Sequence, residues 1–190
     1  MKELILNKKS TILEFSESKL TSKDIKTVNK FKQLVIDEGD VGLGKISKIL
    51  KEKEIKSLKV TNSEFKKADK LIDDELKNAI LIAYSNIKKY HEKQLDGIAI
   101  NNFETTKGVT LWSEFKPIDT VGLYIPGGTA PLFSSLLMQA IPAIIAGCKN
   151  IVICTPPNAN GKINPTILWV ANLLNIKNVY KVGGSQAIFA

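Results

Sequence analysis

The sequence predicts an α/β protein in which a mainly helical amino-terminal region precedes a parallel β-sheet with βαβαβ crossovers. Two observations predict this fold. Beyond residue 120, short apolar strands alternate with helix-length segments, the order that gives parallel strands joined by right-handed crossovers. Before residue 120, apolar residues recur at helical spacing among many charged ones. The fall in charge density near Thr120 divides the chain into an amino-terminal region (1–119) and the start of a second domain (120–190).

The second domain begins with a buried strand over residues 120–125, which Pro126 and the following glycines end. An apolar helix is predicted over 133–146, a strand over 150–155, and a helix over 165–174 that Asn164 caps and Pro165 begins. A third strand is predicted over 178–182, and the run Gly183-Gly-Ser-Gln186 opens another helix. These elements predict an incomplete, Rossmann-like domain that stops in the first turns of a helix.

The amino-terminal region is predicted to contain helices, one short strand and a β-hairpin after an extended arm over residues 1–20. The helices are predicted from Thr21 or Ser22 to residue 38, over 41–53, after the capping-box pair Thr61 and Glu64, and over 73–93. The short strand is predicted over 57–60 and the hairpin over 98–117, with a turn at Lys107-Gly108. The apolar face of the 73–93 helix is predicted to combine Leu76, Ile80, Ala83, Ile87 and Tyr90.

The charge distribution disfavours a nucleic-acid-binding protein despite a net charge of +8. All 27 basic residues are lysines, so the chain has no arginine for bidentate contacts to phosphate or guanine. Lysines and acidic residues are interleaved in the same helices, as on solvated helix faces. No segment resembles a membrane span or a signal peptide. The two cysteines, Cys148 and Cys154, lack metal-site spacing and are expected to be reduced core residues of a cytoplasmic protein.

Three loops are predicted to meet at the carboxyl ends of the strands, where parallel sheets bind their ligands. They follow Tyr124, Cys154 and Val182. Residues 120–190 contain no Asp, Glu or His, so this edge has no general base, no catalytic triad and no metal ligand set. The prediction is therefore a binding platform with no catalytic and no metal-binding residues of its own. The only histidine, His91, is expected at the helix surface or in a supporting position.

The residues of this platform resemble those of histidinol dehydrogenase. The resemblance is carried by Val-Gly-Leu-Tyr-Ile-Pro-Gly-Gly-Thr-Ala-Pro-Leu-Phe-Ser-Ser (121–135), Thr-Pro-Pro (155–157) and Val-Gly-Gly-Ser-Gln-Ala-Ile (182–188), in the family's order and spacing. The family oxidises L-histidinol to L-histidine through the aldehyde in two NAD-dependent steps, the last of histidine biosynthesis. It is a zinc enzyme and a homodimer. By this resemblance, Tyr124 and Gln186 are the residues that contact NAD.

The resemblance also implies what this chain lacks. The family's zinc ligands, its Glu-His acid/base pair and its substrate-binding residues correspond to positions beyond 190, so the chain alone is expected to be inactive. Two other interpretations stay open. One is a non-catalytic remnant or interaction module that keeps the nucleotide-binding platform, and the other is a lysine-rich binder of nucleic acid or anionic surfaces.

Overall fold

The computed structural model describes residues 20–53, 57–96, 102–127 and 132–190. Almost all of the arm predicted over 1–20, the first residues of the predicted hairpin (98–101) and the turn at 128–131 lie outside this part of the chain. Within it, no helix is both long enough and apolar enough to cross a membrane.

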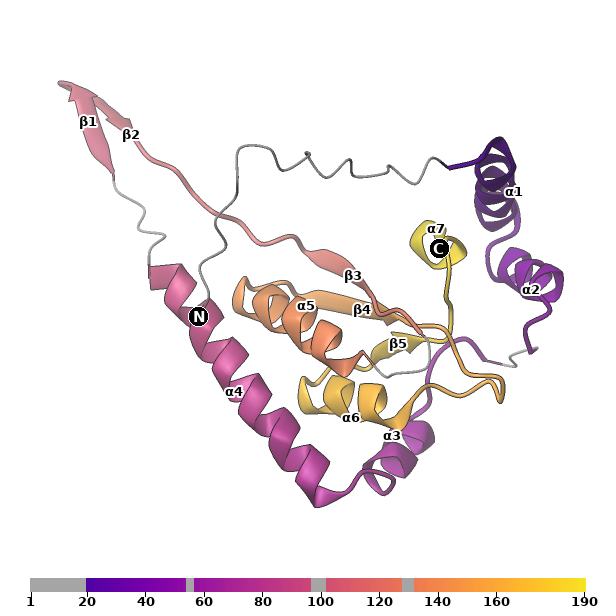
Figure 1. Ribbon diagram of the computed structural model, residues 1–190. Helices are drawn as coiled ribbons and strands as arrows, with labels where there is room; N and C mark the ends of the chain where they lie inside the picture. Colours follow the sequence, from indigo (N-terminus) through magenta and orange to yellow (C-terminus); the bar gives the residue numbers. More distant parts are fainter. Residues whose placement is uncertain (1–19, 54–56, 97–101, 128–131) are drawn as a thin grey trace, which may run out of the picture.

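The centre of the fold is the predicted parallel sheet. Its strands β3 (Thr120–Tyr124), β4 (Asn150–Cys154) and β5 (Asn178–Tyr180) lie in the order β3-β4-β5, with Leu123 opposite Ile153 and Ile153 opposite Val179. The crossover helices α5 (Phe133–Ile145) and α6 (Pro165–Leu173) both cover one face of the sheet (Figure 1). The α/β prediction is thus confirmed, and Asn164 caps α6 through a 2.8 Å hydrogen bond from the Thr166 backbone N–H to its Oδ1.

Two amino-terminal helices share the core of this face. Helix α3 (Asn62–Asp69) packs against α6, and helix α4 (Asp74–Asp96) packs against α5. Phe65 of α3 and Ile80 of α4 belong to the same buried cluster as Leu123 and Ile153 of the sheet. The prediction for α4 was wrong at Tyr90, which is 63% exposed, because the packing of this helix against the core ends near Ile87.

The first two helices form a separate pair. Helix α1 (Ser22–Glu38) begins at Ser22, one of the two predicted starting residues, and is capped by Thr21. Helix α2 (Asp40–Ile49) follows a turn at Gly39, whose φ is +55°. They approach closely because Gly42 has no side chain: a Cβ there would lie 2.1 Å from the Leu34 carbonyl oxygen. Helix α2 ends earlier than predicted, since the chain turns away at Lys51, whose φ is +56°.

The last helix, α7 (Gln186–Phe189), lies on the other face of the sheet from α5 and α6. Its Ala187 packs in a second cluster with Phe31 and Val35 of α1 and with Leu43 and Ile46 of α2. Figure 1 shows α7 next to α1, across the sheet from α5 and α6. Near the carboxyl ends of its strands, the sheet therefore has α5 and α6 on one face and α7, with α1 and α2, on the other. The chain passes from the first face to the second after β5.

The predicted strand at residues 57–60 is instead a single antiparallel bridge, in which Lys59 pairs with Tyr180. Val60 N–H donates to the Val179 carbonyl at 2.9 Å, and Lys181 N–H donates to the Leu58 carbonyl at 2.8 Å. The segment is too short for a ladder because α3 begins immediately after its cap, Thr61. It nevertheless covers the outer edge of β5.

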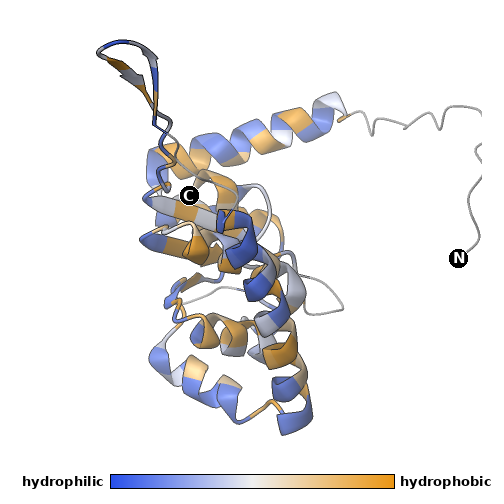
Figure 2. Cartoon of the chain, turned by 90° about the vertical axis from the view of Figure 1, so that its left-hand side faces the viewer, coloured by the Kyte–Doolittle hydropathy of each residue, from blue (hydrophilic) through white to orange (hydrophobic). Residues whose placement is uncertain are grey.

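The predicted hairpin is confirmed by β1 (Phe103–Thr106) and β2 (Val109–Leu111), which are joined by the turn at Lys107-Gly108. Gly108 has a φ of +86°, a value that favours glycine. The second strand is shorter than predicted, because among the described residues its pairing with β1 ends at Leu111 and residues 112–118 form no strand. Figures 1 and 2 show this hairpin projecting away from the rest of the fold.

Candidate functional site

Three loops meet at the carboxyl edge of the sheet, as the sequence predicts. Ile125 N–H donates to the Cys154 carbonyl at 2.9 Å, and Thr155 N–H donates to the Tyr180 carbonyl at 3.1 Å, so the strand pairing continues into the first residues of the loops. Ile125 and Thr155 are both buried. The loop positions are therefore fixed by backbone bonds that extend the sheet.

Pro156 fills the space between the other two loops. A Cβ on Gly127 would lie 2.4 Å from Pro156 Cγ, and a Cβ on Gly183 would lie 2.4 Å from Pro156 Cβ. Both glycines are thus required for the close packing of the loops around one proline ring. The sequence shows the glycines and the proline, but their mutual contact depends on the strand order and could not be predicted from their spacing.

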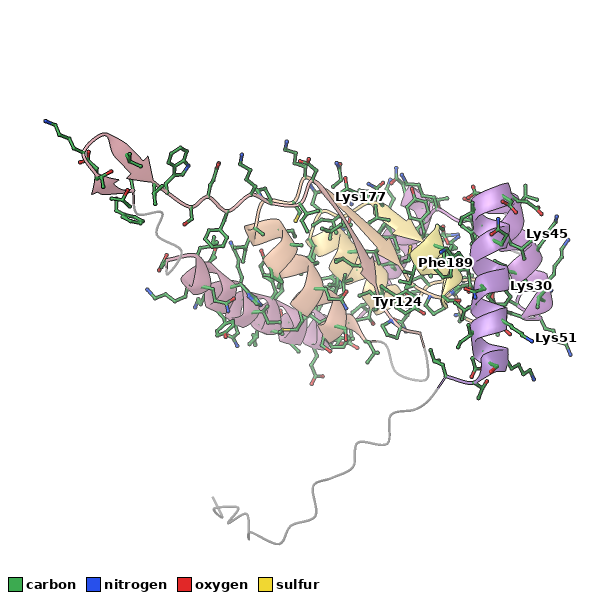
Figure 3. All side chains as sticks on the ribbon, turned by 90° about the horizontal axis from the view of Figure 1, so that it is seen from above. Lys30, Lys45, Lys51, Tyr124, Lys177 and Phe189 are labelled. Atoms are coloured by element: carbon green, nitrogen blue, oxygen red, sulfur yellow. The ribbon has the colours of Figure 1, made fainter. Side chains whose placement is uncertain are left out.

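Tyr124 reaches across β4 to the loop after β5. Its hydroxyl accepts a 2.9 Å hydrogen bond from the Gly184 N–H. Its ring is partly buried against the cluster formed by α1, α2 and α7, and Figure 3 shows Tyr124 and Phe189 on the side of the sheet toward α1. The predicted cofactor residue is thus placed on the face where α7 begins, with its hydroxyl holding the Gly183-Gly184 turn.

Gln186 lies directly under the same turn. Gly184 has a φ of +67°, and a Cβ at this position would lie 2.7 Å from Oε1 and 3.1 Å from Nε2 of Gln186. The Gln186 side chain is 4% exposed, and its carboxamide makes no hydrogen bond within the described residues. The two predicted cofactor residues therefore both lie close to Gly184, one with its hydroxyl and the other with its amide.

An ion pair anchors the last strand beneath this turn. Lys181 is 8% exposed, and its Nζ lies 2.7 Å from Oε1 of Glu64, the residue that closes the capping box of α3. Burial alone raises the pKa of the Glu64 carboxyl, but hydrogen bonds from Lys181 and Thr61 and the Lys181 charge together lower the pKa below its usual value. Glu64 was predicted only as a capping residue, and the contact with Lys181 escaped prediction because 117 positions separate the two.

The side chains of this edge suit binding better than bond-making. The groups that converge there are a phenol, a carboxamide and a backbone N–H. Across the described ranges, no group of three or more His, Cys, Asp or Glu side chains could hold a metal ion. Burial raises the pKa of the nearby Cys154 thiol, so its reactive thiolate is disfavoured. His91 lies on α4, with Nδ1 2.7 Å from Gln94 Oε1.

A hollow of about 920 Å³ adjoins this edge on the α7 side of the sheet. Its floor is made of Val152, Cys154, Tyr180 and Val182, and helix α2 forms one wall. The volume falls within the roughly 300–1,000 Å³ range of small-molecule sites. Neither Tyr124 nor Gln186 is among the residues that line this hollow.

Comparisons with known proteins agree with the resemblance seen in the sequence. The family model described as histidinol dehydrogenase matches residues 15–190. The chain is 46% identical over 164 residues to a histidinol dehydrogenase of Bacteroides thetaiotaomicron, covering 86% of this chain and 38% of that protein. It is 45% identical over 174 residues to one of Campylobacter jejuni, covering 91% of this chain and 37% of that protein.

The crystal structure of histidinol dehydrogenase from Elizabethkingia anophelis superimposes with a TM-score of 0.83 at 46% sequence identity, over 87% of this chain and 38% of that one. The chain thus spans less than two-fifths of the length of these relatives.

Proposed function

Because the chain belongs to the histidinol dehydrogenase family, we propose that it forms the NAD-contacting part of an enzyme that oxidises L-histidinol to L-histidine through L-histidinaldehyde. The observation that carries the proposal is the convergence of Tyr124 and Gln186 on Gly184 at the carboxyl edge of the sheet. The Gln186 amide can both donate to and accept from a ribose or an adenine ring, and the Tyr124 ring offers an apolar face.

The chain itself does not fit a zinc ion. Residues 120–190 contain no Asp, Glu or His, and the described residues hold no ligand cluster. We therefore assign zinc binding, histidinol binding and proton transfer to the part of the family's fold that this chain does not span, and we expect the chain alone to be inactive. In this proposal residues 120–190 are the start of the NAD-contacting domain, residues 1–119 are the region that supports it, and the assembly is a cytoplasmic homodimer.

A second candidate is a non-catalytic module that keeps the nucleotide platform. Two observations favour this candidate. The carboxyl edge of the sheet has no Asp, Glu or His from residues 120–190, and its loops are packed tightly around Pro156. The two candidates predict the same NAD contacts and differ in activity. The two candidates can be distinguished by mixing the chain with the remaining part of a relative. Restored histidinol oxidation supports the enzyme, whereas NAD binding without histidinol oxidation supports the non-catalytic module.

The test of the NAD contacts is titration calorimetry on the 190-residue chain and on three variants. Gln186→Ala should weaken NAD binding about tenfold, the loss expected for about 1.4 kcal/mol of hydrogen bonding. Tyr124→Phe should weaken it less, since the ring remains and only the bond to Gly184 is lost. Tyr84→Phe is the matched control, because Tyr84 lies on α4 and packs in the cluster on the other face of the sheet. Equal NAD affinity in all four proteins would exclude the proposed contacts.

A further inference from the structure

The loop between β4 and α6 contains the one Asn-Gly pair of the chain, Asn160-Gly161. Every other asparagine is followed by a residue that carries a side chain. In an Asn-Gly pair, the glycine nitrogen can attack the carbonyl of the asparagine side chain with little hindrance, because glycine has no Cβ. Asparagine is for this reason a thermolabile residue. Whether the pair reacts in the folded chain depends on how the loop holds the two reacting groups.

The reacting groups are accessible in this loop. Asn160 is exposed, and its carboxamide makes no hydrogen bond within the described residues. A Cβ on Gly161 would meet only Lys53 Cδ, at 3.7 Å, so the neighbours leave the Gly161 nitrogen open to approach. Gly161 has a φ of +74°, at which a residue with a side chain is strained. The glycine that the backbone of this loop favours is thus the residue that makes Asn160 reactive.

The same loop restrains the attack. Gly161 N–H donates to the Asn158 carbonyl at 2.8 Å and closes a turn over Ala159 and Asn160. Asn158 Oδ1 accepts hydrogen bonds from the N–H groups of Asn160 at 2.9 Å and Lys162 at 3.1 Å. The attacking nitrogen must lose its proton, and the closed turn holds that proton in a hydrogen bond. Reaction therefore requires the turn to open, a local event of low cost in an exposed loop.

We propose that Asn160 is a site of spontaneous deamidation whose rate is set by the opening of the turn at Asn158. In the open turn, hydroxide takes the proton of the Gly161 nitrogen, and this nitrogen forms a bond to Cγ of Asn160. The bond from Cγ to the side-chain nitrogen breaks, so ammonia leaves and a succinimide ring remains. Water then opens the ring at one of its two carbonyls, which gives aspartate or isoaspartate. The reaction consumes one water, releases one ammonia and needs no oxidant or reductant.

The modification changes both the charge and the backbone of the loop. Residues 120–190 contain no Asp or Glu, so the product is the first carboxylate in this half of the chain and lowers the net charge of +8 by one. The stem of Lys53 lies beside Gly161, so the new carboxylate has a cation nearby. Isoaspartate also inserts one carbon into the backbone, which displaces the Gly161 N–H from the Asn158 carbonyl. The loop that carries Pro156 thereby loses the hydrogen bond that closes its turn.

The experiment incubates the 190-residue chain at neutral pH beside a synthetic peptide of residues 150–162, and follows both by mass spectrometry. Trypsin releases the same fragment from the chain, because lysines stand at positions 149 and 162. Asn160 should deamidate in the chain, but several-fold more slowly than in the peptide. Asn158, which precedes Ala159, should keep its amide in both. An Asn160 that stays intact in the chain after the peptide has fully converted would overturn the proposed site, and equal rates would overturn the control by the turn.

Three variants test the two parts of the proposal separately. Asn158→Ala removes the acceptor of two backbone hydrogen bonds and leaves Asn160-Gly161 intact, so its rate should rise several-fold toward that of the peptide. Asn150→Ala is the matched control, because Asn150 is exposed at the other end of β4 and bonds only Thr120 through its side chain, and its rate should equal that of the wild type. Asn160→Gln should abolish the acidic shift that isoelectric focusing detects in the aged wild type.

The outcomes are distinguishable. An acidic shift that persists unchanged in Asn160→Gln would show that the charge is lost elsewhere and would overturn the assignment to Asn160. A rate in Asn158→Ala equal to that of the wild type would overturn the role of the turn. Faster deamidation in Asn158→Ala, together with no acidic shift in Asn160→Gln, would support both parts of the proposal.

Discussion

The ion pair between Lys181 and Glu64 predicts that removing the carboxylate destabilises the fold more than removing the ammonium does. Glu64→Gln leaves the ammonium of Lys181, which is 8% exposed, without a counter-charge. Removing one partner of a fully buried pair costs about 3–5 kcal/mol, and we expect about 3 kcal/mol here because the Glu64 side chain is 25% exposed. Lys181→Met leaves a carboxylate that keeps its hydrogen bonds from Thr61 and some water. This variant should therefore lose only about 1–2 kcal/mol.

The assay is urea denaturation at neutral pH, followed by circular dichroism, of the wild type, both single variants and the double variant. The double variant Glu64→Gln/Lys181→Met should be more stable than Glu64→Gln alone, since it no longer buries an unpaired charge. Equal losses in the two single variants, or losses that add up in the double variant, would refute the reasoning.

The same pair predicts a pH dependence. The pKa of the Glu64 carboxyl is lower in the folded chain than its usual value of about 4.5. Its contribution to stability is therefore complete above about 4.5 and is lost as the pH falls through the lower, folded pKa. The free energy of unfolding of the wild type should fall on acidification below pH 5, and that of Lys181→Met should fall less steeply. Parallel pH profiles for the two proteins would contradict this linkage.

Three further predictions concern the loops, the second cysteine and a helix cap. Gly183→Ala should destabilise the fold by about 1–3 kcal/mol in urea denaturation, because the added methyl group overpacks against Pro156. Gly122→Ala should cost under about 1 kcal/mol, because the space around its Cβ is open. Equal losses of stability in the two variants would contradict the close packing of Gly183 on Pro156. Cys154 should react with a disulfide reagent more slowly than in the urea-unfolded chain at the same pH, because burial raises its pKa; equal rates would contradict its burial. Thr61→Ala should cost about 1 kcal/mol by removing the cap of α3, and an unchanged melting curve would argue against it.

The alternation of strands and helices after Thr120 could be predicted because each element carries its own signal. The strands are short apolar runs, and Asn164 with Pro165 marks the start of α6 before any tertiary contact is considered. The capping-box pair of Thr61 with Glu64 is likewise a local signal, and α3 begins directly after Thr61, as the sequence indicates. Local chemistry therefore predicted most element boundaries.

The errors and omissions have a common cause, which is contact between distant segments. Residues 57–60 have the composition of a strand, but only one bridge forms because β5 is short and α3 begins at once. Tyr90 follows the helical period of the buried stripe, yet no element reaches far enough along α4 to cover it. Tyr124 and Gln186 were selected by resemblance to the family. Their convergence on Gly184 depends on the order of the strands, which no local pattern reports.

The covered edge of β5 has a consequence for folding during synthesis. Lys59 contacts Asn178 across 119 positions, with its Nζ 2.9 Å from Oδ1, and Trp169 donates to Asp69 across 100 positions. Helix α3 and the residues before it therefore meet these partners only when the chain has been made as far as Asn178. At roughly 5–20 residues per second, the ribosome needs about 6–24 s to pass from one segment to the other. During that interval the apolar face of α3 lacks its partners on α6, so we expect this part of the core to close only after α6 has been made.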